Sequence, residues 1–180
     1  RRILLGHNQL TGTLGEIFVT PETNHHDGEL GRLNEFASLD ALRKLAKQPN
    51  MDLKTLYSLA EHDPSAIDRW LDVAAEPLRI AIHMLESVLN CQTIIFGGDI
   101  APEILDLLIA KLRPLIPSIA QFGDRDVPRI IKTPNVNEIS LSGVATLPLH
   151  SALDMNIPYT ACLPRLSKLT VKQSLLYLAH

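Results

Sequence analysis

Apolar residues in the first half of the chain recur with the period of an α-helix. One set, spaced three or four positions apart, predicts a helix that begins near Asn34 and ends at about Lys47: Phe36, Leu39, Leu42, Leu45 and Ala46. A second, short helix follows Asp52, whose carboxylate is a favoured N-cap group. Pro64 then opens a third apolar-periodic stretch that extends to Leu89, since proline is tolerated in a first helical turn.

Pro77 should introduce a kink into this long helix. After the end of the helix, the pattern changes to that of a strand. Residues 93–96, Thr-Ile-Ile-Phe, form a continuous apolar run that suits a strand buried on both faces. Gly97 and Gly98 follow, and Pro102 opens the next predicted helix. The order of helix, strand, glycine turn and helix is typical of α/β domains.

Further elements are predicted on either side of this centre. Strands are expected at residues 2–5, 15–20, 127–132 and 138–142, and helices at 143–153 and 171–179. The polar stretch 23–31, which contains two glycines, is predicted to be a surface loop. The pattern as a whole predicts an α/β fold with a mixed sheet, organised as one domain over residues 1–153 and a helical tail over 154–180.

Composition narrows the class of protein. Of the 180 residues, 46% are hydrophobic and 21% are charged, which is the balance of a folded chain, and the net charge of −3 gives no general attraction to nucleic acid. Cys91 and Cys162 are isolated, as is usual in a reducing cytosol, so we expect a cytoplasmic protein. No apolar run is long enough to cross a bilayer, and none follows Arg1-Arg2 as in an export signal. The chain has no initiator Met and is predicted to be a fragment.

Four glycine-containing stretches stand out along the chain. They are Gly-Thr-Leu-Gly-Glu-Ile at 12–17, Gly-Glu-Leu-Gly-Arg-Leu-Asn-Glu-Phe-Ala-Ser at 28–38, Leu-Asn-Cys-Gln-Thr-Ile-Ile-Phe-Gly-Gly at 89–98 and Ser-Leu-Ser-Gly-Val-Ala-Thr-Leu-Pro-Leu at 140–149. In this order and spacing they resemble the ROK (repressor, open reading frame, kinase) family. The first two are similar to its Gly-Glu-Ile-Gly-His segment and the end of its cysteine-rich signature. The last two are similar to its strand and double glycine near ATP and to its closing strand and helix.

The resemblance implies a fold and an organisation. The fold is ribonuclease H-like, that of the actin-like ATPases, with a mixed sheet and flanking helices, and this chain corresponds to the carboxy-terminal half. Family kinases carry a phosphate loop and a catalytic aspartate in a Gly-Asn-Asp-Ala segment upstream, whereas family repressors carry a helix-turn-helix module there. None of these appears in this chain. Dimers are usual in the family, so a homodimer is expected.

The family's structural zinc site is degraded in this sequence. Family members bind zinc through one histidine and three cysteines, because imidazole and thiolates satisfy its tetrahedral coordination. Aligned on the glycines, this chain has Val19 at the histidine and His25, Asp27 and Arg32 at the cysteines. Two surviving ligand types on a polar loop do not hold zinc tightly, so no metal is expected, and the histidines are interpreted as ordinary loop residues.

The sugar-binding residues that the resemblance implies are partly retained. Glu16 matches the glutamate that accepts hydrogen bonds from sugar hydroxyls, whereas the second family glutamate is replaced by Asn34, with Glu35 adjacent. Asn34 can still donate and accept hydrogen bonds. The resemblance therefore predicts a ligand-binding set of Glu16, Asn34 and Glu35, and the alternative for Asn34 is a helix N-cap.

The glycine pair at 97–98 is the predicted cofactor-binding position. In the resemblance, Gly97 and Gly98 let the backbone approach ATP at the start of the next helix, whereas the alternative is a tight strand-to-helix turn with no ligand. ATP is expected only if the protein is a kinase. No catalytic residue is predicted, because three carboxylates that might act as a base lie at helix starts or on the surface: Asp99, Asp106 and Asp154.

The resemblance leads to one function and two alternatives. The first is the sugar-effector-binding and dimerisation part of a ROK-type transcriptional regulator, which contacts DNA only through an upstream module. A regulator needs different ligand affinity in two states but no chemistry, which agrees with the degraded motifs. The alternatives are the carboxy-terminal half of an ATP-dependent sugar kinase, a phosphotransferase, and a non-catalytic scaffold.

Overall fold

The structure, a computed structural model, describes residues 4, 6–7, 11–23, 26–27, 30–121, 123, 126–133 and 138–153. They belong to two units, Gly12–Asn137 and a second unit composed of Arg1–Thr11 with Glu138–His180. Each unit is described by itself. The predicted boundary after residue 153 and the predicted helix at 171–179 fall on the undescribed tail, and of the predicted strand at 2–5 only Leu4 is described.

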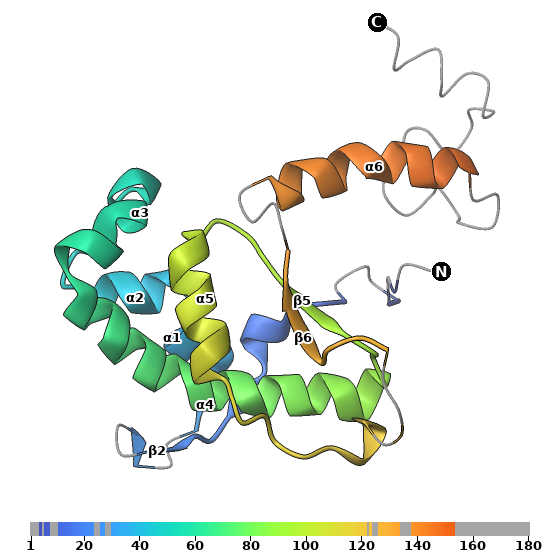
Figure 1. Ribbon diagram of the computed structural model, residues 1–180, viewed down its shortest axis with the longest axis horizontal. Coiled ribbons are helices and arrows are strands. Elements are labelled where there is room, and N and C mark those ends of the chain that lie inside the picture. Colours follow the sequence, from blue (N-terminus) through green and yellow to red (C-terminus); the bar gives the residue numbers. More distant parts are fainter. Residues whose placement is uncertain are drawn as a thin grey trace, which may run out of the picture. The chain divides into compact units, whose positions relative to one another are not determined.

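In its described part, the first unit contains four short strands, then four helices, and then a strand, a helix and a strand (Figure 1). Its elements are a 3₁₀ turn η1 (Leu14–Glu16), strands β1 (Phe18–Val19), β2 (Glu22–Thr23), β3 (His26–Asp27) and β4 (Gly31–Arg32), helices α1 (Leu33–Ala37), α2 (Leu39–Leu45), α3 (Leu53–His62) and α4 (Pro64–Leu89), strand β5 (Ile94–Phe96), helix α5 (Pro102–Lys111), a second 3₁₀ turn η2 (Ile119–Gln121) and strand β6 (Ile130–Lys132). In the second unit the described part contains helix α6 (Ile139–Leu153).

The described strands pair in twos. β1 with β4 and β2 with β3 are antiparallel, whereas β5 and β6 are parallel, with Ile94 opposite Ile130. Parallel neighbours need a crossover connection, and α5 lies in the connection between β5 and β6. The chain is therefore a mixed α/β protein with small sheets and helices, and the stretch predicted to be a loop, 23–31, contributes to the strands β2, β3 and β4.

The predicted helix from Asn34 to Lys47 is two helices. Ser38 is extended between α1 and α2, with φ −82° and ψ 164°, and its hydroxyl accepts a hydrogen bond from the Ala41 backbone N at 3.1 Å. The serine thus caps α2, a local bond that competes with continuation of the helix. The cap interpretation of Asn34 is wrong, because Arg32 is the N-cap residue of α1 and Asn34 lies inside the first turn.

Two strand expectations also need correction. Residues 138–142 are not a strand, since helix α6 begins at Ile139, and a short apolar run of this kind fits either structure. The strand at 93–96 is confirmed as β5, but it is not buried on both faces, because Ile95 is 60% exposed. A two-stranded sheet that packs helices on one face leaves alternate residues of the other face in solvent.

The long helix α4 is confirmed and carries the core. It runs along one side of the first unit in Figure 1, and it continues through Pro77 to Leu89. α1, α2, α3 and α5 contact it. Fully or almost fully buried side chains from these helices form the core: Leu42, Leu56, Ile67, Trp70, Leu71, Ala74, Ile104 and Leu108. Burial of each large apolar side chain stabilises the fold by about 1.5–3 kcal/mol.

Two helices, α3 and α4, are each capped by the aspartate that directly precedes them. Asp52 accepts a hydrogen bond from the Thr55 backbone N at 2.8 Å, and Asp63 accepts one from the Ala66 backbone N at 3.0 Å. Hydrogen bonds from Thr55 lower the pKa of Asp52, and those from Ser65 and Ala66 lower the pKa of Asp63. The predicted cap at Asp52 is confirmed.

A buried ion pair joins α4 to β6. Glu86 has only 1% of its side chain exposed, and its two oxygens accept hydrogen bonds from Arg129 Nε at 2.8 Å and from Arg129 Nη2 at 2.6 Å. Nη2 also donates to the Ile116 carbonyl at 2.7 Å, and the hydrogen bonding of Arg129 to the Glu86 carboxylate raises the pKa of Arg129. The backbone carbonyl of Arg129 accepts from the Ile94 N at 2.8 Å, so one residue anchors both α4 and the β5–β6 pair.

Acid should weaken the two aspartate caps. Because the folded protein holds each pKa below the ordinary value of 3.8, the caps contribute fully above about pH 4, and their contribution is lost as the pH falls through the lowered pKa. Urea midpoints followed from about pH 5 to about pH 2 should fall less steeply for the double variant Asp52→Asn, Asp63→Asn, since asparagine caps without titrating. Parallel pH profiles would contradict this assignment.

Removing one partner of the buried pair should be costly. Arg129→Met leaves the Glu86 carboxylate buried without its counter-ion, and we expect the free energy of unfolding to fall by about 3–5 kcal/mol in urea denaturation. The double variant Glu86→Leu, Arg129→Met should lose much less than the sum of the single variants. Arg69→Met, an exposed arginine on α4, is the control and should change stability by less than about 0.5 kcal/mol.

Candidate functional site

Glu16 and Asn34, which are 18 residues apart, meet at one exposed surface of the first unit. Asn34 Nδ2 donates a hydrogen bond to Glu16 Oε1 at 3.4 Å, and Arg32 Nη1 lies 3.3 Å from Glu16 Oε2. The antiparallel pairing of β1 with β4, together with a hydrogen bond from the Leu33 N to the Ile17 carbonyl at 2.9 Å, brings the two segments together. We call Glu16, Arg32 and Asn34 the Glu16 cluster.

Glycines make this close approach possible. A Cβ atom on Gly15 would overlap the side-chain amide of Asn34. A Cβ on Gly31 would come within 2.6 Å of the Phe36 ring and 3.0 Å of Glu35 Oε2. Both glycines are therefore required by packing, since neither has a positive φ that would itself demand glycine.

The third predicted ligand residue, Glu35, is bonded within its own helix start. Its Oε2 accepts a hydrogen bond from the Arg32 backbone N at 3.2 Å, which satisfies a donor at the beginning of α1. The structure therefore brings Glu16 and Asn34 together and holds the Glu35 carboxylate against the backbone beside them.

The Glu16 cluster is open and polar. The side chains of Glu16 and Arg32 are 57% and 51% exposed, and both contacts to Glu16 exceed 3.2 Å. Hydrogen bonds this long at an exposed site exchange readily with water or with the hydroxyl groups of a ligand. The cluster presents carboxylate acceptors beside amide and guanidinium donors, a combination that can bind the hydroxyl groups of a polyol.

The zinc positions that the family implies do not fit zinc in this chain. Val19 is an aliphatic side chain that is 2% exposed, and Arg32 places a permanent positive charge beside Glu16. His25 lies outside the described residues, as does the side chain of Asp27. Within the described part of the chain, no three His, Cys, Asp or Glu side chains are placed to hold a metal ion.

The glycine turn at 97–98 directly follows β5. Gly98 has φ +126°, a conformation that other residues rarely adopt, and a Cβ there would meet no atom within 4 Å. The Ile100 N donates to the Gly98 carbonyl at 2.9 Å, and the exposed Asp99 adds to the effect of burial in raising the pKa of Tyr57 on α3. The backbone at this turn is thus accessible to solvent. A ligand could approach it closely, and the same geometry also fits a tight turn without any ligand.

Of the three aspartates considered as bases, the two that the structure describes lie in surroundings that do not indicate a catalytic role. Asp106 forms an ion pair with Lys132 at 2.6 Å, Asp99 is exposed beside the glycine turn, and Asp154 lies outside the described residues. Arg32 is the member of the cluster that sequence reasoning missed. It had counted only as a lost zinc ligand, and the one available signal was a charge opposite to that of Glu16.

The model of the ROK family matches residues 1–150 of the 180-residue chain. The chain belongs to the ROK family. Comparison with curated proteins and with solved structures gives no match.

Membership of the ROK family sets the range of functions. ROK proteins include transcriptional regulators and sugar kinases, and they bind sugars. In the described residues no helix is long and apolar enough to cross a membrane, since α4 has the length but carries charges throughout. The Glu16 cluster lies within the matched part of the ROK chain, as does the glycine turn at 97–98.

Substitution of Gly15 should disrupt the cluster. In Gly15→Ala the new methyl group displaces the Asn34 amide from Glu16, so NMR of the side-chain amides should show a shifted Asn34 signal and the unfolding temperature should fall by about 2–4 °C for each kcal/mol of strain. Gly143→Ala is the control, because Gly143 lies in α6 with open space around it and alanine favours helix. An unchanged Asn34 signal in Gly15→Ala would contradict the close packing.

Proposed function

We propose that this chain is the sugar-effector-binding and dimerisation part of a ROK-type transcriptional regulator. The observation that carries the proposal is the contact of Glu16 Oε1 with Asn34 Nδ2 at 3.4 Å on an exposed surface. Carboxylate and amide groups side by side match the alternating donors and acceptors of a sugar's hydroxyl groups. Binding at such a site can shift a conformational equilibrium without any catalytic group.

The ribonuclease H-like fold is part of this proposal. Its support is the unit formed by β5, α5 and β6, two parallel strands with a helix in the crossover, followed by membership of the ROK family. A homodimer in the cytoplasm, DNA contact through an upstream module, and the convergence of Glu16, Asn34 and the glycine turn on one cleft belong to the same proposal.

A sugar kinase is the second candidate, and the glycine turn favours it. The open backbone at Gly98, with φ +126°, is the kind of surface against which a nucleotide can lie closely. In that case Gly97 and Gly98 would contact ATP, while phosphoryl transfer would need a phosphate loop and a base from outside this chain. An upstream helix-turn-helix favours the regulator, whereas an upstream phosphate loop favours the kinase.

The proposal can be tested by measuring the unfolding temperature of the full-length protein with each of a panel of sugars. A bound sugar should raise the unfolding temperature, and Glu16→Gln should weaken its affinity about tenfold or more, since hydrogen bonds to a charged group contribute about 1.5–3 kcal/mol. Asn34→Ala should weaken it less. Glu61→Gln, an exposed glutamate on α3, is the matched control and should bind as the unchanged protein does.

The same panel separates the candidate functions. A sugar response that is independent of ATP, with no phosphorylated product, supports the regulator. A response to ATP that Gly98→Ala abolishes, together with a phosphorylated sugar, supports the kinase. A flat response to every sugar would overturn both and favour a scaffold.

A further inference from the structure

Arg32, at the end of β4, contacts three segments at the Glu16 cluster. In the β1–β4 register Arg32 stands directly opposite Phe18, and its guanidinium lies over the Phe18 ring at 5.7 Å from the centroid. Its Nη1 reaches Glu16 in η1 at 3.3 Å, and its backbone N is held by Glu35 in α1 at 3.2 Å. One residue thus spans η1, β1 and the start of α1.

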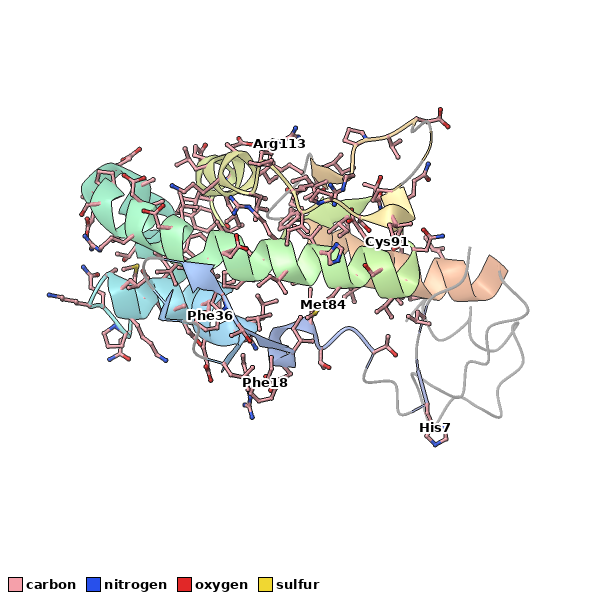
Figure 2. All side chains as sticks on the ribbon, turned by 90° about the horizontal axis from the view of Figure 1, so that it is seen from below. His7, Phe18, Phe36, Met84, Cys91 and Arg113 are labelled. Carbon is pink, nitrogen blue, oxygen red and sulfur yellow. The ribbon has the colours of Figure 1, made fainter. Side chains whose placement is uncertain are left out.

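The ring contact lies on the solvent side of this connection. Phe18 is 55% exposed and extends away from α4 in Figure 2, whereas the adjacent Val19 is buried. The guanidinium therefore covers an apolar ring that would otherwise face water. Arginine suits this arrangement, because its planar guanidinium can stack on a ring while its N–H groups point sideways to a carboxylate.

The same position excludes a metal ion. A guanidinium has no lone pair available for coordination and stays charged at all relevant pH values, so it repels a divalent cation. Of the four positions at which the family would coordinate zinc, the two whose side chains are described thus offer a buried aliphatic group and a cation. Zinc coordination therefore does not join the segments around Glu16, and the β1–β4 pairing is supplemented by side-chain contacts instead.

We propose that Arg32 holds the Glu16 cluster together in place of a metal ion and is the positioning residue for the Glu16 carboxylate. The guanidinium fixes Oε2, and this leaves Oε1 directed to Asn34 and to ligand hydroxyls. The positioning role rests on the proposed sugar site, whereas the metal-free role is independent of it.

Metal analysis with chelation tests the metal-free role on the full-length protein. Purified protein should contain no stoichiometric zinc by elemental analysis, and excess EDTA should leave its unfolding temperature unchanged. Arg32→Met keeps the apolar stem but removes the charge, and it should lower the unfolding temperature by about 2–4 °C. Stoichiometric zinc, or a large loss of stability on chelation, would overturn the proposal.

Matched variants distinguish a specific role from general damage. Arg32→Lys keeps the charge but loses the planar group, so it should recover only part of the lost stability. Phe18→Leu should reduce the effect of Arg32→Met, because the ring contact is then already absent. Arg69→Met, the exposed arginine on α4, should leave the unfolding temperature unchanged. Equal stability of Arg32→Met and the unchanged protein would also overturn the proposal.

A double-mutant cycle tests positioning. If Arg32 acts on the ligand through Glu16, Arg32→Met should weaken sugar affinity about fivefold in the unchanged background, yet have almost no effect in Glu16→Gln. Equal losses in both backgrounds would show that Arg32 acts independently of Glu16 and would overturn the positioning role. If no sugar binds the unchanged protein, the proposed function fails, while the stability and chelation results still decide the metal-free role.

Discussion

Burial against α4 is the constraint on which the rest of the first unit depends. Trp70 and Ile67 are each 1% exposed, and α1, α2, α3 and α5 all contact this helix. The short elements around it cannot bury enough surface by themselves, since isolated helices shorter than about 12–15 residues and two-stranded sheets are marginal in water. Glu86 extends the same constraint beyond the apolar core, because its ion pair with Arg129 fixes β6 to the helix.

The packing of α1 against α4 determines the geometry of the Glu16 cluster. α1 contacts α4 and buries Leu33 and Phe36, and Asn34 lies between these two apolar residues on the same short helix. Once Leu33 and Phe36 are buried, the direction of Asn34 is set, and Gly15 leaves room for its amide. The Asn34 side chain, on a five-residue helix, is thus held in place by the core beneath it.

Arg32 stands at one of the positions where the resemblance to the ROK family implies a zinc ligand. A metal ion joins segments by coordination, whereas a guanidinium joins them by hydrogen bonding and by stacking on a ring. The two solutions differ in strength, because an exposed ion pair is worth far less than a metal site. If the Glu16 cluster binds a ligand, as proposed, a weak connection leaves its segments free to move, since elements of low local stability are those that move when a ligand binds.

The secondary-structure features that depend on near neighbours along the chain can be predicted from the sequence alone. The cap at Asp52, the helix that starts at Pro64 and runs to Leu89, and the strand before Gly97 follow from local bonds and apolar periods. The folded structure was needed to show that Asn34 faces Glu16, 18 residues away, and that the half-buried Arg129 pairs with the buried Glu86, 43 residues away. A charged or amide side chain looks the same in sequence whether it is solvated or paired, because its partner is chosen by the packing of the helices between them.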